Sequence, residues 1–150
     1  MTPKELENVF RKICRFDETL GFQFEVPNPG EALYSFTVED RHLASPSQCH
    51  GGVLAALMDA TMGVAVLTEA VREGNLCSTV EFKINYLNRA KKGDLLKSFG
   101  EIEFKGARLV VAHATIKCGE KIIAKAMGTF SLYPADKTDI AAWAKGQSDE

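Results

Sequence analysis

The segment Cys49-His50-Gly51-Gly52 stands directly before a long apolar stretch, where its backbone could hold a carbonyl oxygen. The first N–H groups of a helix lack intrahelical partners, and two glycines leave them accessible to a ligand. The helix dipole adds positive potential at the same end. Such a site can polarise a carbonyl and stabilise the oxyanion that forms when the carbonyl is attacked. The alternative is that the two glycines form only a tight turn.

Asp59 is the one charged residue between Val53 and Leu67, where nearly every other residue is apolar or small. An ionised carboxylate in such surroundings is costly unless it is paired or hydrogen-bonded. Residues of this kind often belong to functional sites, because their chemistry requires an unusual environment. We therefore interpret Asp59 as the candidate catalytic side chain. A structural aspartate bonded to a nearby hydroxyl or backbone group is the alternative.

The spacing of these two groups predicts how many chains build the site. Gly51 and Asp59 are eight positions apart (59 − 51), which is about 12 Å along a helix. One chain cannot easily bring both groups to the same carbonyl. If they cooperate, the carboxylate comes from a second subunit, so the sequence predicts a homodimer with sites at a two-fold interface.

The helix that carries Asp59 must lie inside the protein. The stretch Val53–Leu67 is apolar on all sides, so it must be surrounded by protein or lipid. Fifteen residues are too few to span a membrane, and we expect a central core helix. A separate N-terminal helix is predicted within residues 1–20, because Thr2 and Glu5 have capping-box spacing around Pro3.

The remaining elements are strands. Two short strands are predicted before the central helix and four after it, at about Phe22–Val26, Leu33–Val38, Ser78–Leu87, Leu95–Phe104, Arg108–Lys117 and Lys121–Tyr133. Short turns between the last four strands predict an antiparallel meander. Residues 134–150 form a C-terminal tail. The order predicts a single α+β domain over residues 1–150, with a sheet curled around one helix.

Composition excludes several classes of protein. A net charge of −2 argues against a general nucleic-acid binder. No signal sequence or membrane-spanning run is recognised, and Cys14, Cys49, Cys77 and Cys118 are too scattered for a disulfide scaffold or a zinc site. We therefore expect a cytoplasmic protein with reduced thiols and without a metal site.

The other titratable side chains give weaker signals. His113 is predicted to be a packed structural histidine, because it lies mid-strand among apolar residues, and His42 is predicted to lie on a loop surface. Cys49 is adjacent to the glycine pair but has no evident base partner, so we do not expect a nucleophilic cysteine.

The run His50-Gly51-Gly52, followed by Leu54, Leu57, Asp59 and Gly63, resembles the H-G-G-x-x-x-x-L-x-D-x-x-x-G signature of hotdog-fold acyl-CoA thioesterases. The most similar type is the phenylacetate-degradation and hydroxybenzoyl-CoA branch. Further blocks match in the family order, so that the likeness extends from about Leu33 to Tyr133. These blocks are Thr79–Leu87, Ala90–Asp94, Lys105–Arg108 and Ile123–Phe130.

The resemblance implies roles for the residues of the signature. The acidic residue matching Asp59 acts as nucleophile or as general base towards water, and the backbone N–H matching Gly51 polarises the thioester carbonyl. The histidine matching His50 holds the loop in shape, and the hydroxyl matching Thr79 helps to place the attacking water. The implied activity is hydrolysis of acyl-CoA to a free acid and CoA, without a cofactor.

The resemblance also implies a binding surface for the CoA nucleotide. In the family, this surface is formed by the strand end and turn matching Tyr86 to Lys91 and by the turn matching Phe104 to Leu109. The candidates here are Tyr86, Arg89, Lys91, Lys105, Gly106 and Arg108, and Gly52 is a further candidate substrate contact beside Gly51. The four basic side chains are candidate phosphate contacts, and ordinary solvated turn charge is their alternative reading. The implied assembly is a homodimer with shared sites, expected to pair further into a homotetramer as a dimer of dimers.

One position departs from the family. Asn or Gln usually stands seven residues before the first glycine, where its amide orients the carboxylate, the water or the substrate. Ala44 occupies that position here, and Ser45, Ser47 or Gln48 is a candidate substitute. A non-catalytic acyl-CoA-binding protein is therefore a second hypothesis. A hydratase of the same fold is a third, but its Asp-x-x-x-x-His pattern is not found.

Overall fold

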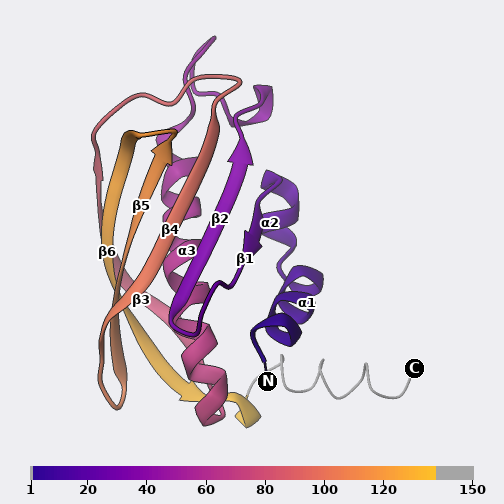
Figure 1. The fold of residues 1–150 in the computed structure, drawn as a ribbon, viewed down its shortest axis with the longest axis vertical. Helices are drawn as coiled ribbons and strands as arrows, with labels where there is room; N and C mark the ends of the chain where they lie inside the picture. Colours follow the sequence, from indigo (N-terminus) through magenta and orange to yellow (C-terminus); the bar gives the residue numbers. More distant parts are fainter. Residues whose placement is uncertain (1, 138–150) are drawn as a thin grey trace.

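The computed structural model describes residues 2–137, in which an antiparallel sheet curls against one long helix (Figure 1). This confirms the predicted α+β arrangement. The elements run in the order α1 (Pro3–Ile13), α2 (Arg15–Leu20), β1 (Gln23–Glu25), β2 (Glu31–Thr37), η1 (Asp40–His42), α3 (Gly51–Ala70), η2 (Val71–Glu73), β3 (Asn75–Tyr86), β4 (Leu95–Lys105), β5 (Leu109–Cys118), β6 (Lys121–Pro134) and η3 (Ala135–Lys137). Most of the expected tail, residues 138–150, lies outside the described residues.

The N-terminal segment forms two helices instead of the one expected. Thr2 and Glu5 form the predicted capping box at the start of α1, with the Glu5 carboxylate accepting from the Thr2 N–H at 2.7 Å. The chain leaves helical geometry at Cys14, whose ψ is 84°, and resumes as α2. Gly21 ends α2 in the left-handed conformation, which glycine adopts without steric cost. Both helices lie beside β1 and β2 (Figure 1).

The central helix α3 is longer than the sequence pattern indicated. It has 20 residues, so length does not exclude a membrane span as we had expected. By length and composition, Gly51–Glu73 could cross a membrane, but half of its most apolar stretch is buried inside the protein. It lies against β2, β3, β4, β5 and β6. Protein therefore surrounds much of this helix, as predicted for a core helix.

The strand order corrects the predicted meander. The sheet runs β1-β2-β4-β5-β6-β3, so β3 pairs with β6 and not with its sequence neighbour β4. The reason is that α3 leads the chain from β2 to the far edge before β3 begins. The loop after β3 then returns to the end of β2, where the Val38 N–H donates to Asp94 and the Gly93 N–H donates to Val38. One edge of β3 has no strand partner within the described chain.

The core lies between α3 and the inner face of the sheet. Leu57, Met58 and Met62 of α3 are completely buried, as are Tyr34 of β2 and Phe130 of β6. Burial of side chains of this size contributes about 1.5–3 kcal/mol each to folding. The core therefore fixes the position of α3, and with it the position of Asp59 relative to the strands.

Candidate active site

Asp59 and Thr79, two of the predicted site residues, are joined by a hydrogen bond. Thr79 lies on β3, and its hydroxyl donates to Oδ1 of Asp59 at 2.6 Å. Asp59 is half-buried on α3, whereas Thr79 is exposed. A bulge follows Thr79 in its pairing with β6, and bulges re-aim side chains along a strand. The other carboxylate oxygen of Asp59, Oδ2, takes no part in this hydrogen bond.

Asp59 and Thr79 border a cavity of about 250 Å³, called here the α3 cavity. Its walls come from α1, α2, one face of α3, β3 and β6. They consist mainly of apolar groups, including Phe10, Phe16, Ala56, Ala60, Gly63, Val64, Leu67, Leu76 and Phe130. Alanine and glycine on this face of α3 leave room between the helix and the strands. An apolar chain beside a carboxylate is the ligand that such a cavity fits.

The start of α3 has the donor geometry expected from its two glycines. His50 is the N-cap residue, and its Nδ1 accepts a hydrogen bond from the Gly52 N–H at 2.7 Å. Within residues 2–137, the Gly51 N–H has no hydrogen-bond acceptor. His50 therefore holds the turn, while the adjacent Gly51 N–H stays free to donate to a ligand oxygen.

Tyr86 lies beside this helix start. Its hydroxyl donates to the Gly51 carbonyl at 2.8 Å, and a Cβ on Gly51 would stand 3.4 Å from the tyrosine ring. Tyr86 was predicted as a substrate contact. In the structure, its hydrogen bond to Gly51 also stabilises the first turn of α3. Burial raises the pKa of the Tyr86 hydroxyl, so it remains a donor at neutral pH.

A second cavity of about 270 Å³, called here the helix-start cavity, opens beside Gly51. Gln48, Tyr86, Asn88 and Arg89 contribute its polar groups. Ala44 is not among its lining residues, but Gln48 is. Of the three residues proposed as substitutes for the missing amide, Gln48 is therefore the one that borders the same cavity as Gly51.

One chain does not bring Asp59 and Gly51 to a common cavity. Asp59 borders the α3 cavity, and Gly51 borders the helix-start cavity. Both lie on α3, where their separation along the helix axis is fixed by the rise per residue. That a second subunit completes the site stays a prediction. If Asp59 and Gly51 act on one carbonyl, the two groups must come from different chains.

The predicted nucleotide-binding residues fall at opposite ends of the molecule. Arg89 and Lys91 lie in the loop between β3 and β4, near the start of α3. Lys105, Gly106 and Arg108 lie in the hairpin between β4 and β5, near the other end (Figure 1). The structure therefore brings together only part of this set within one chain.

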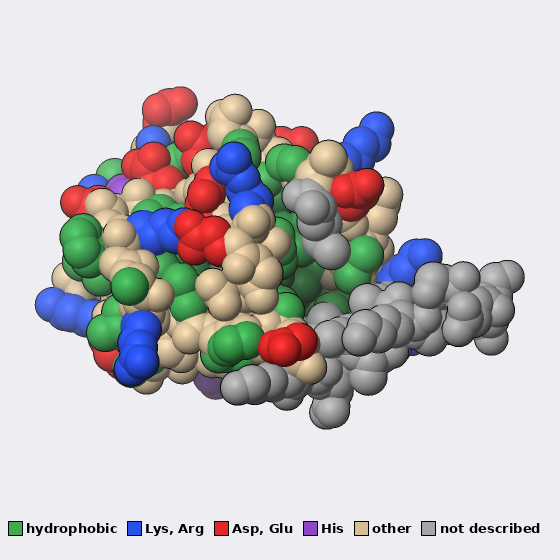
Figure 2. Space-filling view, turned by 90° about the horizontal axis from the view of Figure 1, so that it is seen from below, with side chains coloured by type: hydrophobic (Ala, Val, Ile, Leu, Met, Phe, Trp, Pro, Cys, Tyr) green, Lys and Arg blue, Asp and Glu red, His purple; other side chains and the backbone are tan. Residues whose placement is uncertain are grey.

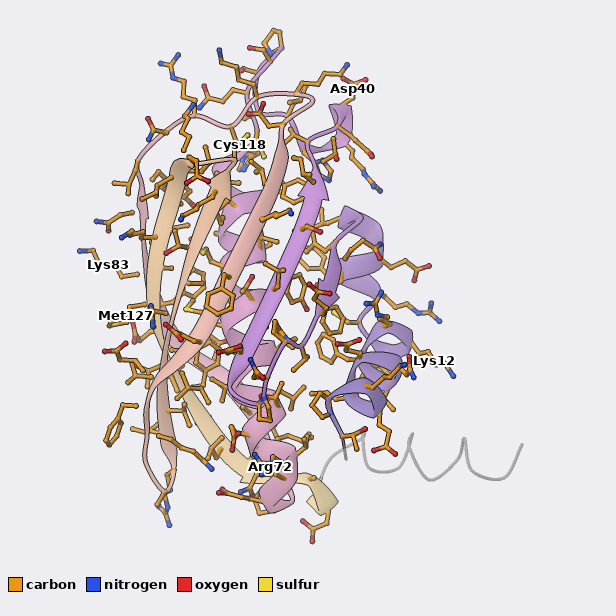
Figure 3. The ribbon with its side chains drawn as sticks, in the orientation of Figure 1. Lys12, Asp40, Arg72, Lys83, Cys118 and Met127 are labelled. Atoms are coloured by element: carbon orange, nitrogen blue, oxygen red, sulfur yellow. The ribbon has the colours of Figure 1, made fainter. Side chains whose placement is uncertain are left out.

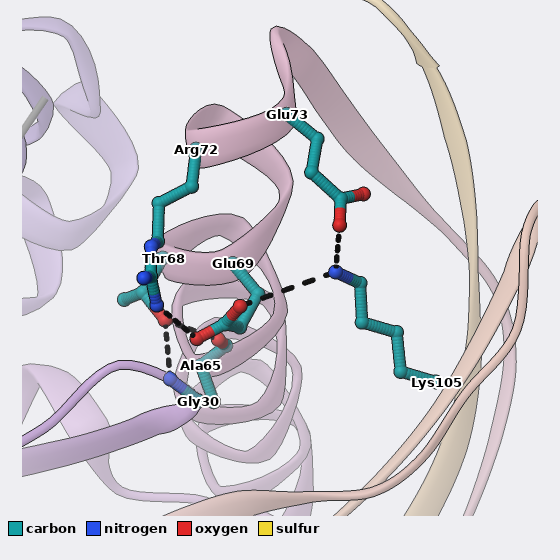
Figure 4. A network of polar contacts seen from close by, with 7 residues as sticks. All are labelled: Gly30, Ala65, Thr68, Glu69, Arg72, Glu73 and Lys105. Atoms are coloured by element: carbon teal, nitrogen blue, oxygen red, sulfur yellow. Dashed lines mark hydrogen bonds and ion pairs between the residues drawn. The ribbon is translucent and has the colours of Figure 1, made fainter.

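Lys105 is held in an ion-pair network at the C-terminal end of α3 (Figure 4). Its ammonium contacts the Glu73 carboxylate and lies 3.9 Å from Glu69. Glu69 is also paired with Arg72 at 3.0 Å. By contrast, within residues 2–137 no carboxylate forms an ion pair with Arg89, Lys91 or Arg108, and all three are exposed. Seen from this end, acidic and basic side chains are interspersed (Figure 2).

The prediction for His42 was wrong, and His113 is half-buried beside carboxylates instead of packed among apolar groups. His42 is buried rather than on a loop surface: its Nδ1 accepts from the Glu39 N–H at 2.9 Å, and its Nε2 lies 2.8 Å from the Leu20 carbonyl. It joins η1 to α2, which a sequence pattern cannot reveal. His113 lies on the outer face of the sheet, 3.2 Å from both Glu101 and Glu103. Alternation along β5 turns it away from the core.

The outer face also carries exposed apolar side chains. Met127, Phe99 and Leu95 are exposed there, and Met127 and Lys83 project away from α3 (Figure 3).

All four cysteines are free thiols, and burial raises the pKa of Cys49 to about 11. The Cys49 thiol is therefore protonated at neutral pH, which agrees with its exclusion as a nucleophile.

Sequence reasoning missed a second carboxyl group in the α3 cavity. Asp17 of α2 borders the cavity and accepts a hydrogen bond from the Tyr34 hydroxyl at 2.9 Å. The signal available in the sequence was weak, because Asp17 stands between Arg15 and Glu18 in a segment that reads as a solvated helix face.

Within the described residues, no group of three or more His, Cys, Asp or Glu side chains is arranged to hold a metal ion.

The chain is similar in sequence to known proteins. The sequence profile described as the thioesterase superfamily matches residues 48–124, just over half of the chain. A Pseudomonas aeruginosa protein, provisionally named an esterase, is 26% identical over 130 residues, which are 87% of this chain and 96% of that protein.

Solved structures extend the likeness to the fold. The PaaI protein of the Escherichia coli phenylacetic acid degradation operon has a TM-score of 0.80 at 20% identity, covering 87% of this chain and 93% of that one. A hypothetical thioesterase from Streptococcus pneumoniae, solved with coenzyme A, has a TM-score of 0.72 at 24% identity, covering 86% and 97%. These likenesses confirm the hotdog fold expected from the sequence.

Proposed function

This chain belongs to the thioesterase superfamily, and on that premise we propose that it hydrolyses acyl-CoA thioesters to a free acid and CoA. The observation that carries the proposal is the Thr79–Asp59 hydrogen bond of 2.6 Å at the wall of an apolar cavity. A carboxylate held by a hydroxyl, beside space for an acyl chain, suits attack on a thioester carbonyl.

In the proposed reaction, the acyl group occupies the α3 cavity and its carbonyl carbon lies beside Asp59. Asp59 either attacks that carbon or takes a proton from a water molecule that attacks it. The C–S bond then breaks, and CoA leaves as a thiolate. On the first route, water hydrolyses the anhydride formed between the acyl group and Asp59, which releases the free acid and restores the carboxylate. On the second route, the free acid forms directly and the proton held by Asp59 passes to the thiolate. Thr79 fixes one oxygen of the carboxylate, so that the other can face the reacting atoms.

The oxyanion that forms needs a hydrogen-bond donor, for which the Gly51 N–H is the candidate. This N–H has no acceptor among residues 2–137 and stands at the start of α3, and both observations support this role. Because Gly51 and Asp59 border different cavities, we propose that the donor comes from a second copy of the chain.

The edge of β3 is where we propose that the second copy pairs. This strand has 12 residues, carries Thr79 and has β6 as its one partner in the described chain. A long open edge offers a row of unpaired backbone groups to another strand. The exposed apolar outer face, with Met127 and Phe99, is the surface we propose for a further pairing of dimers.

CoA binding is proposed at the helix-start cavity and the adjoining loop. Arg89 and Lys91 supply positive charge there without a carboxylate partner among the described residues. The S. pneumoniae neighbour, which was solved with coenzyme A, supports this class of ligand. Gln48 is proposed to supply the amide that Ala44 lacks, because it borders the same cavity as Gly51.

The test is CoA release from a panel of aryl, short, medium and long acyl-CoAs, with the Asp59→Asn variant as the control. We expect turnover on part of the panel and a fall in kcat of at least about 100-fold in the variant. Circular dichroism and chromatography establish that the variant is folded. Equal turnover by wild type and variant would rule out the proposed role of Asp59.

A non-catalytic acyl-CoA-binding protein is the second candidate, and Ala44 is the observation that favours it. The Ala44 N–H donates to the Gln48 carbonyl at 2.9 Å, but its side chain can orient neither water nor carboxylate. Calorimetry with the same panel separates the two functions. Tight binding of acyl-CoA by folded protein, with no release of CoA, would favour the binding protein.

A further inference from the structure

The α3 cavity extends along one face of α3. Its wall on this helix consists of Ala56, Asp59, Ala60, Gly63, Val64 and Leu67. With about 100° of rotation per residue, these positions share one side of the helix. Asp59 and Leu67 are eight positions apart (67 − 59), which is about 12 Å at about 1.5 Å per residue. The cavity therefore has room for an elongated ligand along the helix.

The strand wall of the cavity gives a similar length. On β3, Leu76 and Thr79 border the cavity three positions apart, which is about 10 Å at about 3.3 Å per residue. Thr79 is bonded to Asp59, whereas Leu76 lies in one buried cluster with Leu67. These two contacts join α3 and β3 at different points. The carboxylate therefore lies at one end of the wall, and the two leucines lie at the other.

The leucine end of the cavity is closed by α1. Leu6 of α1 belongs to the same cluster as Leu67 and Leu76, and none of the three is more than 9% exposed. Tyr133 of β6 pairs with Leu76, packs against this cluster and also borders the cavity. A ligand that follows α3 away from Asp59 therefore meets packed side chains and not solvent.

α1 is anchored to β1 and to the residue that follows it. The Glu7 carboxylate accepts a hydrogen bond from the Val26 N–H at 2.6 Å, and the Arg11 guanidinium donates to the Phe24 carbonyl. The ring of Phe10 packs edge-on against that of Phe24, with centroids 5.8 Å apart. Because these contacts hold α1 in place, Leu6 supports the end of the cavity from a fixed position.

We propose that the site takes unbranched acyl groups of about eight to ten carbons, and that Leu67 and Leu76, held by Leu6, form the end wall that sets this limit. This inference rests on the proposed function, because it places the acyl group in the α3 cavity with its carbonyl beside Asp59. With C–C bonds of about 1.5 Å, an extended chain advances about 1.25 Å per carbon. Each carbon up to the wall is buried and strengthens binding. A longer chain must displace the leucines or bend back.

The experiment measures binding without turnover, using alkyl thioethers of CoA from ethyl to tetradecyl and calorimetry. In wild type, affinity should rise about threefold to fourfold with each added carbon, up to a break at about eight to ten carbons. Leu67→Ala shortens the end wall and should move this break to chains about two carbons longer.

A second variant should move the break the other way. Gly63 borders the cavity between Asp59 and Leu67, and a Cβ there would stand 3.7 Å from the Phe130 ring, which is ordinary contact. Gly63→Leu therefore places a side chain partway along the cavity. We expect the break at chains about four carbons shorter, because Gly63 is about 6 Å along the helix from Asp59.

Val66→Ala is the matched control, because Val66 is the neighbour of Leu67 on α3, is completely buried and does not border the cavity. Its break should equal that of wild type. Leu6→Ala tests the support from α1 and should shift the break in the same direction as Leu67→Ala.

A wild-type series with no break, or with one far from the expected length, would overturn the proposal. So would a break that stays in place in the folded cavity variants; if one of them does not fold, the other decides. Lack of turnover on thioesters, with the break and its shifts present, would count against hydrolysis alone.

Discussion

Thr79 and Asp59 are 20 residues apart in sequence, and a 2.6 Å hydrogen bond joins them across β3 and α3. The hydroxyl fixes one oxygen of the one acidic side chain in the middle of the apolar helix. This relationship makes Asp59 part of a two-element site and not a solitary buried charge. It also offers a direct test, because the sheet contains a similar pair outside the cavity.

Removal of the Thr79 hydroxyl should slow the reaction. We expect Thr79→Ala to lower kcat about tenfold, since a carboxylate that loses a charge-assisted hydrogen bond is less well oriented. Thr79→Ser should retain most of the rate. Thr129→Ala is the control, because the Thr129 hydroxyl donates to Glu81 at 2.7 Å and neither residue borders the α3 cavity. Thiol release provides the measurement, and equal losses at Thr79 and Thr129 would contradict the assigned role.

Two inactive variants should restore activity when they are mixed. Asp59→Asn removes the carboxylate, and Gly51→Pro removes the N–H at the first position of α3, where proline is well tolerated. In a mixed dimer with shared sites, one site has an intact Asp59 from one chain and an intact Gly51 from the other. Refolding the two variants together should therefore yield turnover that neither possesses alone. Absence of turnover in a mixed dimer of demonstrated composition would place both groups in one chain.

His50 should contribute to stability through its cap. His50→Ala removes the acceptor of the Gly52 N–H, and we expect the free energy of unfolding to fall by about 1 kcal/mol. His50→Asn supplies a new capping oxygen and should recover much of the loss. Urea denaturation monitored by circular dichroism measures both variants. If His50→Asn were as unstable as His50→Ala, the cap would not be the source of the effect.

Arg89 should affect CoA affinity more than Lys105 does. Arg89 is exposed and borders the helix-start cavity, whereas Lys105 is already neutralised by Glu73 and Glu69. We expect Arg89→Ala to raise KM for acyl-CoA several-fold and to weaken its dependence on salt. Lys105→Ala should change KM less, and Arg72→Ala, whose partner is Glu69, serves as the control. A larger effect at Lys105 would show that substrate displaces its ion pairs.

The pH dependence of stability should carry a contribution from Asp17. Burial raises the pKa of this carboxyl above its ordinary value of 3.8, so the folded state holds the proton more tightly than the unfolded state. The stabilising contribution is therefore complete below pH 3.8 and is lost as pH rises through the folded-state pKa. Asp17→Asn removes this dependence. Relative to the variant, wild type should lose stability with rising pH, as urea midpoints will reveal; a constant difference would contradict it.

The sequence alone was sufficient for the element types and for the central pair of candidates. Alternation and capping signals come from local chemistry, so the N-terminal capping box and the six strands could be located to within a few residues. An aspartate in an apolar helix and a glycine pair before it were equally visible. Their meaning depends only on backbone donors, charge and periodicity, which are properties of short segments.

Only the tertiary structure decided which distant segments meet. It placed β3 beside β6, buried His42 against α2, tied Lys105 to Glu73 and brought Asp17 to the cavity of Asp59. Each of these contacts joins elements that are distant in sequence, and the β3–β6 pairing follows from the path of α3 across the sheet. The arrangement of the elements is set by packing of the whole core, in which many side chains contribute small energies together. No single stretch of sequence contains that sum, and so none could predict these contacts.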